Sequence, residues 1–141
     1  ARHKFAQSIN ITPEKIAVNK DEEAFIAKIM EAIEKNIDNV DYTIDQLAVD
    51  TAVSRTNLYK RIKHMLGITP NEFIRNVKMK YAARLLTETS ISVTEVSLMV
   101  GFQTPRYFSQ CFKRVFGVLP TEYRGASDDA PQQPNTAVIN K

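Results

Sequence analysis

The strongest constraint on the fold of this chain is an internal repeat with an offset of fifty residues. The segment TAVSRTNLYKRIKHMLGITPNEFIR begins at Thr51, and VGFQTPRYFSQCFKRVFGVLPTEYR begins at Val100, with Ser54 aligned to Thr104. The apolar and helix-terminating positions agree: Leu58 with Phe108, Ile62 with Phe112, Leu66 with Phe116, Gly67 with Gly117, Pro70 with Pro120, Glu72 with Glu122, and Phe73 with Tyr123. Lys63 also aligns with Lys113, whereas Arg55, Thr56, Tyr59 and Lys60 align with Pro105, Arg106, Ser109 and Gln110. A repeat that keeps its apolar positions and varies the others indicates two similar modules that recognise two different things.

Helix start and stop signals divide each repeat into a short helix, a tight turn and a longer helix. Ser54 and Thr104 are N-caps, and Gly67 and Gly117 end the helices that they open. Capping-box patterns occur at Thr43–Gln46, Thr69–Glu72 and Ser92–Glu95. We expect helices at 21–36, 43–50, 54–66, 70–88, 93–100 and 104–116, and a short helical turn at 120–124. The chain is therefore predicted to be all-α, with helix-turn-helix units at 43–66 and 93–116.

These elements predict a division of the chain into five segments. They are a linker arm from an upstream domain at 1–20, a first helix-turn-helix subdomain at 21–69, a long linker helix at 70–88, a second helix-turn-helix subdomain at 89–124, and a disordered tail at 125–141. The arm includes a short extended piece at 16–18. The tail is polar, with proline and glutamine and no periodicity. The chain opens without a methionine, so we expect it to be a piece of something longer.

Charge is distributed unevenly along the chain, although the net charge is only +3. Residues 14–50 hold ten acidic and four basic residues, whereas residues 51–114 hold eleven basic and three acidic residues. This asymmetry favours a polyanionic partner for the second region. The single cysteine excludes an internal disulfide, and no run of apolar residues is long enough for a membrane span. We expect a cytoplasmic, nucleoid-associated domain without membrane contact.

The second helix of each unit is predicted to present a polar face. In the first unit, Leu58, Ile62 and Met65 recur at helical spacing and are expected to face inward. In the second, Phe108, Phe112, Val115 and Phe116 do so. The second helix of a helix-turn-helix unit enters the major groove of DNA with its N-terminal residues first. The candidate DNA-contacting residues of the first unit are therefore Ser54, Arg55, Thr56, Tyr59, Lys60 and Lys63. Those of the second are Thr104, Arg106, Tyr107, Gln110 and Arg114, with Lys113 also available. Arg and Lys donate to guanine, Gln pairs with adenine, and capped helix N-termini offer amides to phosphates.

Over about residues 21–124, the sequence closely resembles the AraC/XylS family of bacterial transcription regulators. The segment GFQTPRYFSQCFKRVFGVLPTEYR, which begins at Gly101, fits the signature of the family's second half. The spacing of Arg75, Lys78, Ala82, Leu85 and Leu86 fits the family's linker helix. The resemblance implies a seven-helix domain that places its two recognition helices in successive major grooves, about 34 Å apart.

The resemblance also implies base contacts by particular residues. They are Thr56, Tyr59 and Lys60 in the first recognition helix, and Pro105, Arg106, Tyr107 and Gln110 in the second. Pro105 departs from the usual chemistry because it offers only apolar contact. Leu119 stands where a capping Ser or Thr would suit Pro120. Ala52 fills a turn position often held by glycine, at little cost if its backbone is right-handed.

The acidic N-terminal part resembles the connector of hybrid two-component regulators, in which a sensor kinase and a receiver precede an AraC-type output domain. A ligand-sensing domain upstream is the alternative. The expected partners are double-stranded DNA, an upstream receiver or sensor domain, and RNA polymerase as a further candidate. The isolated domain is expected to be a monomer or weak dimer, and the full-length protein could be membrane-anchored through its sensor.

Competing functions are disfavoured by the same residues. Two histidines, one cysteine and scattered acids give no metal spacing and no catalytic triad, so no enzyme activity, metal or cofactor is expected. Cys111 is expected to be a small buried residue, and Tyr107 to pack on the domain or to contact DNA. A helical-repeat scaffold that binds proteins is the alternative function, although such arrays usually need three or more repeats.

Overall fold

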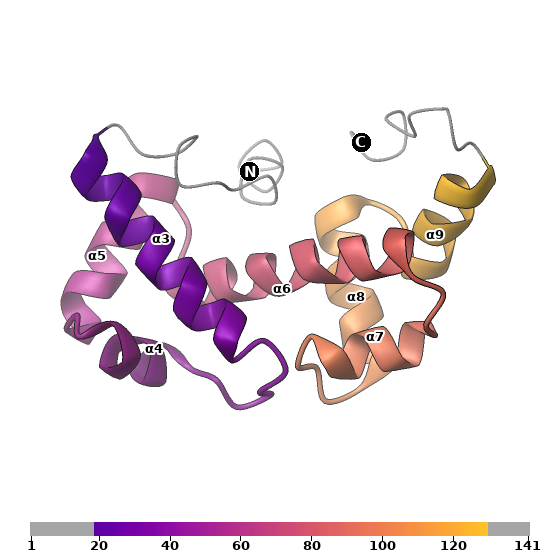
Figure 1. The fold of residues 1–141 in the computed structure, drawn as a ribbon, viewed down its shortest axis with the longest axis horizontal. Coiled ribbons are helices and arrows are strands. Elements are labelled where there is room, and N and C mark those ends of the chain that lie inside the picture. Colours follow the sequence, from indigo (N-terminus) through magenta and orange to yellow (C-terminus); the bar gives the residue numbers. More distant parts are fainter. Residues whose placement is uncertain (1–18, 130–141) are drawn as a thin grey trace.

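The computed structural model describes residues 19–129 as seven α-helices, with no strand in that range (Figure 1). The helices are α3 (Lys20–Lys35), α4 (Ile44–Thr51), α5 (Arg55–Leu66), α6 (Pro70–Glu88), α7 (Val93–Met99), α8 (Pro105–Phe116) and α9 (Pro120–Asp129). The predicted all-α, seven-helix class is confirmed. The extended piece at 16–18, nearly all of the arm, and residues 130–141 of the tail lie outside the described residues.

Polar caps decide where most of these helices begin. The side-chain oxygens of Asn19, Thr43, Ser54, Thr69, Ser92 and Thr104 each accept a hydrogen bond from the backbone amide three residues on. Each such bond satisfies one of the four amides that a helix start leaves unpaired. The observed helix bounds therefore lie within one or two residues of the predicted ones, apart from α9.

Only one of the three predicted capping boxes is complete. At α6, Thr69 accepts from the Glu72 amide, and the Glu72 carboxylate accepts from the Thr69 amide at 3.0 Å. At α4 the box is wrong, because the Gln46 side chain donates to Asp50 at 2.9 Å instead of turning back to Thr43. At α7, Ser92 accepts from the Glu95 amide without a return bond among the described contacts.

The long helix α6 serves two separate hydrophobic cores, one on each side of the molecule (Figure 1). Its first half contributes Phe73, Ile74 and Val77 to a mainly aliphatic core with α3, α4 and α5. Its second half contributes Met79, Ala82, Ala83 and Leu86 to a core with α7, α8 and α9 that is rich in aromatic rings. Lys78 lies where the helix changes from one core to the other. The two helix-turn-helix units are thus built around one shared helix.

The last helix is longer than the sequence predicts. Instead of a short turn that ends at Arg124, α9 continues to Asp129, so the prediction of a disordered tail is wrong for residues 125–129. Glu122 accepts a hydrogen bond from the Leu119 amide at 2.8 Å, which starts the helix without a capping hydroxyl. Arg124 donates to the carbonyls of Leu86 and Thr89, which lie at the C-terminal end of α6. The last helix is therefore tied directly to the shared one.

Ala52, which ends α4, has a left-handed backbone with φ 57° and ψ 36°. Alanine was expected to cost little stability here only if its backbone were right-handed, and it is not. Every other positive φ in the described residues belongs to a glycine: Gly67, Gly101 and Gly117. A left-handed conformation costs a non-glycine residue about 1–2 kcal/mol.

Replacement of Ala52 by glycine is expected to stabilise the domain. The free energy gained by relieving the left-handed strain exceeds the free-energy cost of the extra backbone entropy that glycine loses on folding. The net stabilisation is about 0.5–1 kcal/mol, which raises Tm by roughly 3–6 °C. Thermal unfolding followed by circular dichroism measures it. Ala27 is the matched control, because it is exposed in the middle of α3 and Ala27→Gly should destabilise the domain by a similar amount. A loss of stability in the Ala52 variant would show that the methyl group, and not the backbone, decides this position.

Candidate nucleic-acid interface

Helices α5 and α8 are equal in length and occupy the same place in the two units, as the fifty-residue offset predicts. Their inward faces are confirmed: Leu58, Ile62, Phe108 and Phe112 are completely buried, and Phe116 is 5% exposed. Met65 and Val115 are only half-buried at the edges of the cores. Cys111 is buried at 1% exposure, as predicted.

All of the predicted contact residues lie on the surface of the molecule. The exposed residues are Ser54, Arg55, Thr56, Tyr59, Lys60 and Lys63 in the first unit, and Thr104, Pro105, Arg106, Tyr107, Gln110 and Arg114 in the second. Each set is contributed by one recognition helix and its cap. The two sets therefore form two separate exposed faces, one in each unit.

The N-terminal end of α5 is held by contacts to its own unit. Ser54 accepts a hydrogen bond from the Asn57 amide at 3.1 Å. The guanidinium of Arg55 lies 3.3 Å from a carboxylate oxygen of Asp45 on α4, although both side chains remain about two-thirds exposed. An ion pair with that exposure contributes at most about 1 kcal/mol. Asp45 therefore holds Arg55 only loosely and can release it to a more strongly anionic partner.

One cation of α5 points away from this face. The Arg61 guanidinium lies 3.8 Å from the centre of the Phe25 ring on α3, in a cation–π contact. Arg61 therefore packs on the first unit, while Lys60 and Lys63 have no ion pair among the described residues. This contact explains why a single helix can carry four cations and direct only some of them outward.

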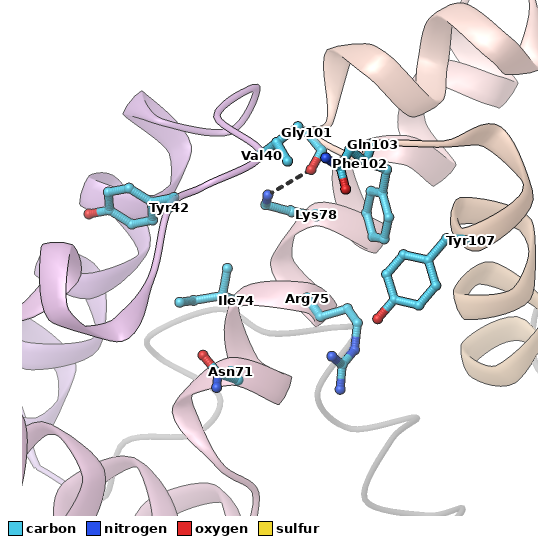
Figure 2. Close-up of a pocket in the computed structure, with 10 residues that line it drawn as sticks. All are labelled: Val40, Tyr42, Asn71, Ile74, Arg75, Lys78, Gly101, Phe102, Gln103 and Tyr107. Atoms are coloured by element: carbon cyan, nitrogen blue, oxygen red, sulfur yellow. Dashed lines mark hydrogen bonds between the residues drawn. The ribbon is translucent and has the colours of Figure 1, made fainter.

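At the N-terminal end of α8, Tyr107 both packs on its unit and reaches into solvent. Its ring lies 5.6 Å from that of Phe102, and the side chain is 46% exposed. Figure 2 shows its hydroxyl directed away from Phe102, toward Arg75 of α6. Tyr107 is therefore neither a buried plug nor a free surface residue, and its hydroxyl is placed to bind a polar group.

A pocket of about 320 Å³ lies between the two units and beside Tyr107 (Figure 2). It is lined by Val40, Tyr42, Asn71, Ile74, Arg75, Lys78, Gly101, Phe102, Gln103 and Tyr107. Sequence reasoning placed Arg75 in the linker helix but gave it no functional role. Its guanidinium makes no hydrogen bond or ion pair within the described residues, so it adds a positive charge to the pocket between the two units. Tyr42 is anchored at the pocket wall by a 2.8 Å hydrogen bond to Asp50, and burial and this bond raise its pKa.

The part of the chain from 19 to 129 lacks the features of two other kinds of site. No group of three or more His, Cys, Asp or Glu side chains is arranged to hold a metal ion there. Within the same range, no helix has the length and apolar character needed to cross a membrane.

A family model described as a helix-turn-helix domain matches residues 47–126, which include both recognition helices and the shared helix between them. This match covers more than half of the chain. The chain belongs to the AraC-type helix-turn-helix family. The resemblance inferred from the sequence is thereby confirmed.

Relatives and solved structures agree with membership of the AraC-type family. A protein named histidine kinase P4 from Formosa agariphila is 36% identical over 121 residues, which cover 86% of this chain and 9% of that protein. The C-terminal domain of AraT, a response regulator from Geobacillus stearothermophilus, superposes with a TM-score of 0.64 at 33% identity, covering 71% of this chain and 83% of that one. The DNA-binding domain of AdpA, a global transcriptional factor solved with a target DNA, gives a TM-score of 0.67 at 26% identity, covering 76% and 96%. The chain spans less than a third of the length of the first curated relatives that it matches.

Proposed function

We propose that this domain binds double-stranded DNA sequence-specifically in transcription regulation, with α5 and α8 as its recognition helices. The observation that carries this proposal is the pair of capped helices, equal in length, whose exposed faces differ in sequence while their buried faces correspond. The complex of the similar AdpA domain with its target DNA supports the same conclusion. Each helix enters one of two successive major grooves, N-terminal end first, as helix-turn-helix proteins do.

The proposed contacts follow from the chemistry of the exposed side chains. Thr56, Tyr59 and Lys60 read bases in one half-site, and Pro105, Arg106, Tyr107 and Gln110 read bases in the other. Arg55, Lys63, Lys113 and Arg114 bind phosphates, together with the backbone amides at the helix starts capped by Ser54 and Thr104. Because the two sets differ, the half-sites should differ in sequence.

We further propose that the domain is the output part of a longer regulator, preceded by a receiver or sensor domain. The similarity to a histidine kinase and to the C-terminal domain of a response regulator supports this context. In that setting, the segment boundaries at 20, 69, 88 and 124 separate the arm, the two units and the linker helix, with α9 extending the second unit to 129. The isolated domain would act as a monomer or weak dimer in the cytoplasm, on nucleoid DNA, with RNA polymerase as a candidate partner of the intact regulator. Its role would be regulatory and not enzymatic.

Selection of binding sites from a random pool of DNA duplexes tests the proposal. The selection should be run at about 150 mM salt, which suppresses non-specific binding. We expect a motif with two unlike half-sites about one helical turn apart. The alternative, a helical scaffold that binds proteins, predicts no enriched motif from the domain or from the longer regulator. A motif with two identical half-sites would contradict the assignment of different recognition faces.

Single alanine replacements in the two recognition helices should change preference in different half-sites. Arg106→Ala is expected to reduce discrimination at one or two base pairs by about 1–3 kcal/mol, and Lys60→Ala to do so about one turn away. Binding to a panel of duplexes with single base changes measures both effects. Arg61→Ala is the matched control, because its guanidinium packs on Phe25 and its loss should leave base preference unchanged. Effects of both test variants on the same base pairs would rule out the two-groove arrangement.

A further inference from the structure

Lys78 is a buried lysine at the point where α6 passes from one core to the other. It is 5% exposed, although lysine is almost never fully buried without partners. Its ammonium donates to the carbonyl oxygen of Asn39 at 3.2 Å and to that of Gly101 at 3.2 Å; Figure 2 shows the second bond. Burial lowers the pKa of Lys78, and the nearby Asp38 carboxylate opposes that shift.

The two carbonyls belong to different helix-turn-helix units. Asn39 lies in the connection between α3 and α4 of the first unit. Gly101 lies in the turn between α7 and α8 of the second unit, three residues before the cap of the recognition helix. One ammonium group therefore joins a loop of the first unit to the recognition turn of the second, through the middle of the shared helix.

Few other contacts within the described residues connect the units. The main helix-to-helix packing joins α3, α4 and α5 among themselves and to α6, and joins α7, α8 and α9 among themselves and to α6. Only the partly buried Ile37 and Tyr81 pack against both cores. Besides the Lys78 bridge, the orientation of one unit relative to the other depends on these two side chains, on the close approach of the Gly101 turn to the backbone of Ile37 and Asp38, and on the stiffness of α6.

The turn at Gly101 is fitted closely to this bridge. Its φ is +76°, and a Cβ atom added there would lie 2.6 Å from the Ile37 carbonyl oxygen and 2.7 Å from the Lys78 ammonium. Phe102, the next residue, packs on Phe108 of α8 at 5.5 Å between ring centres. A shift of the Gly101 carbonyl would therefore be passed on to the recognition helix.

We propose that Lys78 is a positioning residue that fixes the separation and relative orientation of α5 and α8, and so sets the half-site spacing that the domain accepts. This inference rests on the proposed function, because half-site spacing has meaning only for a DNA-binding domain. Lys78 itself touches no base. Its effect arises because two tethered modules bind DNA more tightly than either alone only when their separation and orientation match those of the two half-sites. The gain in affinity is lost when the two geometries do not match.

A series of DNA spacers tests the proposal with the variant Lys78→Met. Each base pair inserted between half-sites displaces one site by about 3.4 Å and rotates it by about 35°. We expect the parent protein to lose at least about tenfold in affinity for the first insertion. Lys78→Met should bind the optimal duplex at least about tenfold more weakly and show a smaller insertion penalty, while binding to a single half-site stays unchanged.

Control variants separate positioning from folding and from general loss of charge. Arg84→Met removes an exposed cation of the same helix whose contacts, an ion pair with Glu88 and a cation–π contact with Tyr81, both lie within α6, and it should preserve the spacing preference. If Lys78→Met loses helical content, Lys78→Gln, which keeps a donor without the charge, is used for the same series. Equal losses on the single half-site and the full site, or an unchanged insertion penalty, would overturn the proposal.

A measurement without DNA distinguishes failure of this inference from failure of the proposed function. Spin labels are attached to cysteines introduced at the exposed residues Ala27 on α3 and Lys113 on α8, while the buried Cys111 stays protected. We expect one narrow distance distribution in the parent protein and a broader or shifted one in Lys78→Met. An unchanged distribution would refute the positioning role even if DNA binds. A parent protein that binds no selected duplex would refute the proposed function, whereas the label distances would still test the bridge.

Discussion

Replacement of Phe112 by alanine is expected to destabilise the second unit by about 3–5 kcal/mol. Its side chain is completely buried. Its ring centre lies 4.4 Å from that of Phe116, 5.2 Å from that of Tyr123 and 5.8 Å from that of Phe108. Removal of the ring therefore leaves a large cavity at the centre of the aromatic core and abolishes three ring contacts. A loss of this size is comparable to the whole stability of a small domain.

Urea unfolding followed by circular dichroism measures the loss, and amide NMR signals locate it. Because the two cores are separate, signals of α8 and α9 should weaken before those of α3, α4 and α5. Ile62→Ala, the equivalent change in the first unit, should cost about 2–5 kcal/mol and produce the opposite order. Gln110→Ala, on the exposed face of α8, should change stability by less than about 0.5 kcal/mol. Simultaneous loss of all signals in both core variants would show that α6 couples the units into one cooperative unit.

Raising the salt concentration from about 50 to about 200 mM is expected to weaken DNA binding by roughly 150-fold. This value follows if Arg55, Lys63, Lys113 and Arg114 each neutralise one phosphate, which gives a log–log slope of about −3.6. The helix N-termini add donors without adding a full charge. Affinity measured by fluorescence anisotropy with a labelled duplex over that salt range gives the slope.

The salt slope also identifies individual phosphate contacts. Lys63→Gln should reduce the slope by about 1 and weaken binding on all duplexes alike, whereas Gln110→Ala should leave the slope unchanged and alter base preference. Asp45→Asn frees Arg55 from its ion pair, so it should strengthen binding, mostly at low salt. A nearly flat slope for the parent protein would favour apolar binding and so the scaffold alternative.

Most helix bounds could be predicted because their causes are local. Ser54 and Thr104 act on amides three residues away, and Gly67 and Gly117 end the recognition helices in left-handed conformations. The exposed and buried faces of α5 and α8 follow from helical periodicity alone. Which of the exposed residues contact bases stays a prediction, because it depends on how DNA lies across both helices.

The features that sequence reasoning missed depend on distant parts of the chain. A lysine at 78 is typical of a surface, but the change of core along α6 buries it between two loops. The left-handed backbone of Ala52 was indicated only by the glycine often found at that turn position in the family, because alanine itself does not indicate it. The pairing of Arg55 with Asp45 arises from packing of the same two helices. The end of α9 was missed because GASDD has little helix propensity of its own, while Arg124 ties the helix to α6.

The separation of buried and exposed positions in the two units has an evolutionary consequence. A duplicated unit can acquire a new reading face by substitutions at positions such as Thr56 or Arg106, which are exposed and support neither core. The two cores have already diverged, since Ile62 in one corresponds to Phe112 in the other, yet the shared helix still connects them. If the two faces read the two half-sites as proposed, descendants of such a protein can change one half of their target at a time, while the distance between the halves is inherited unchanged.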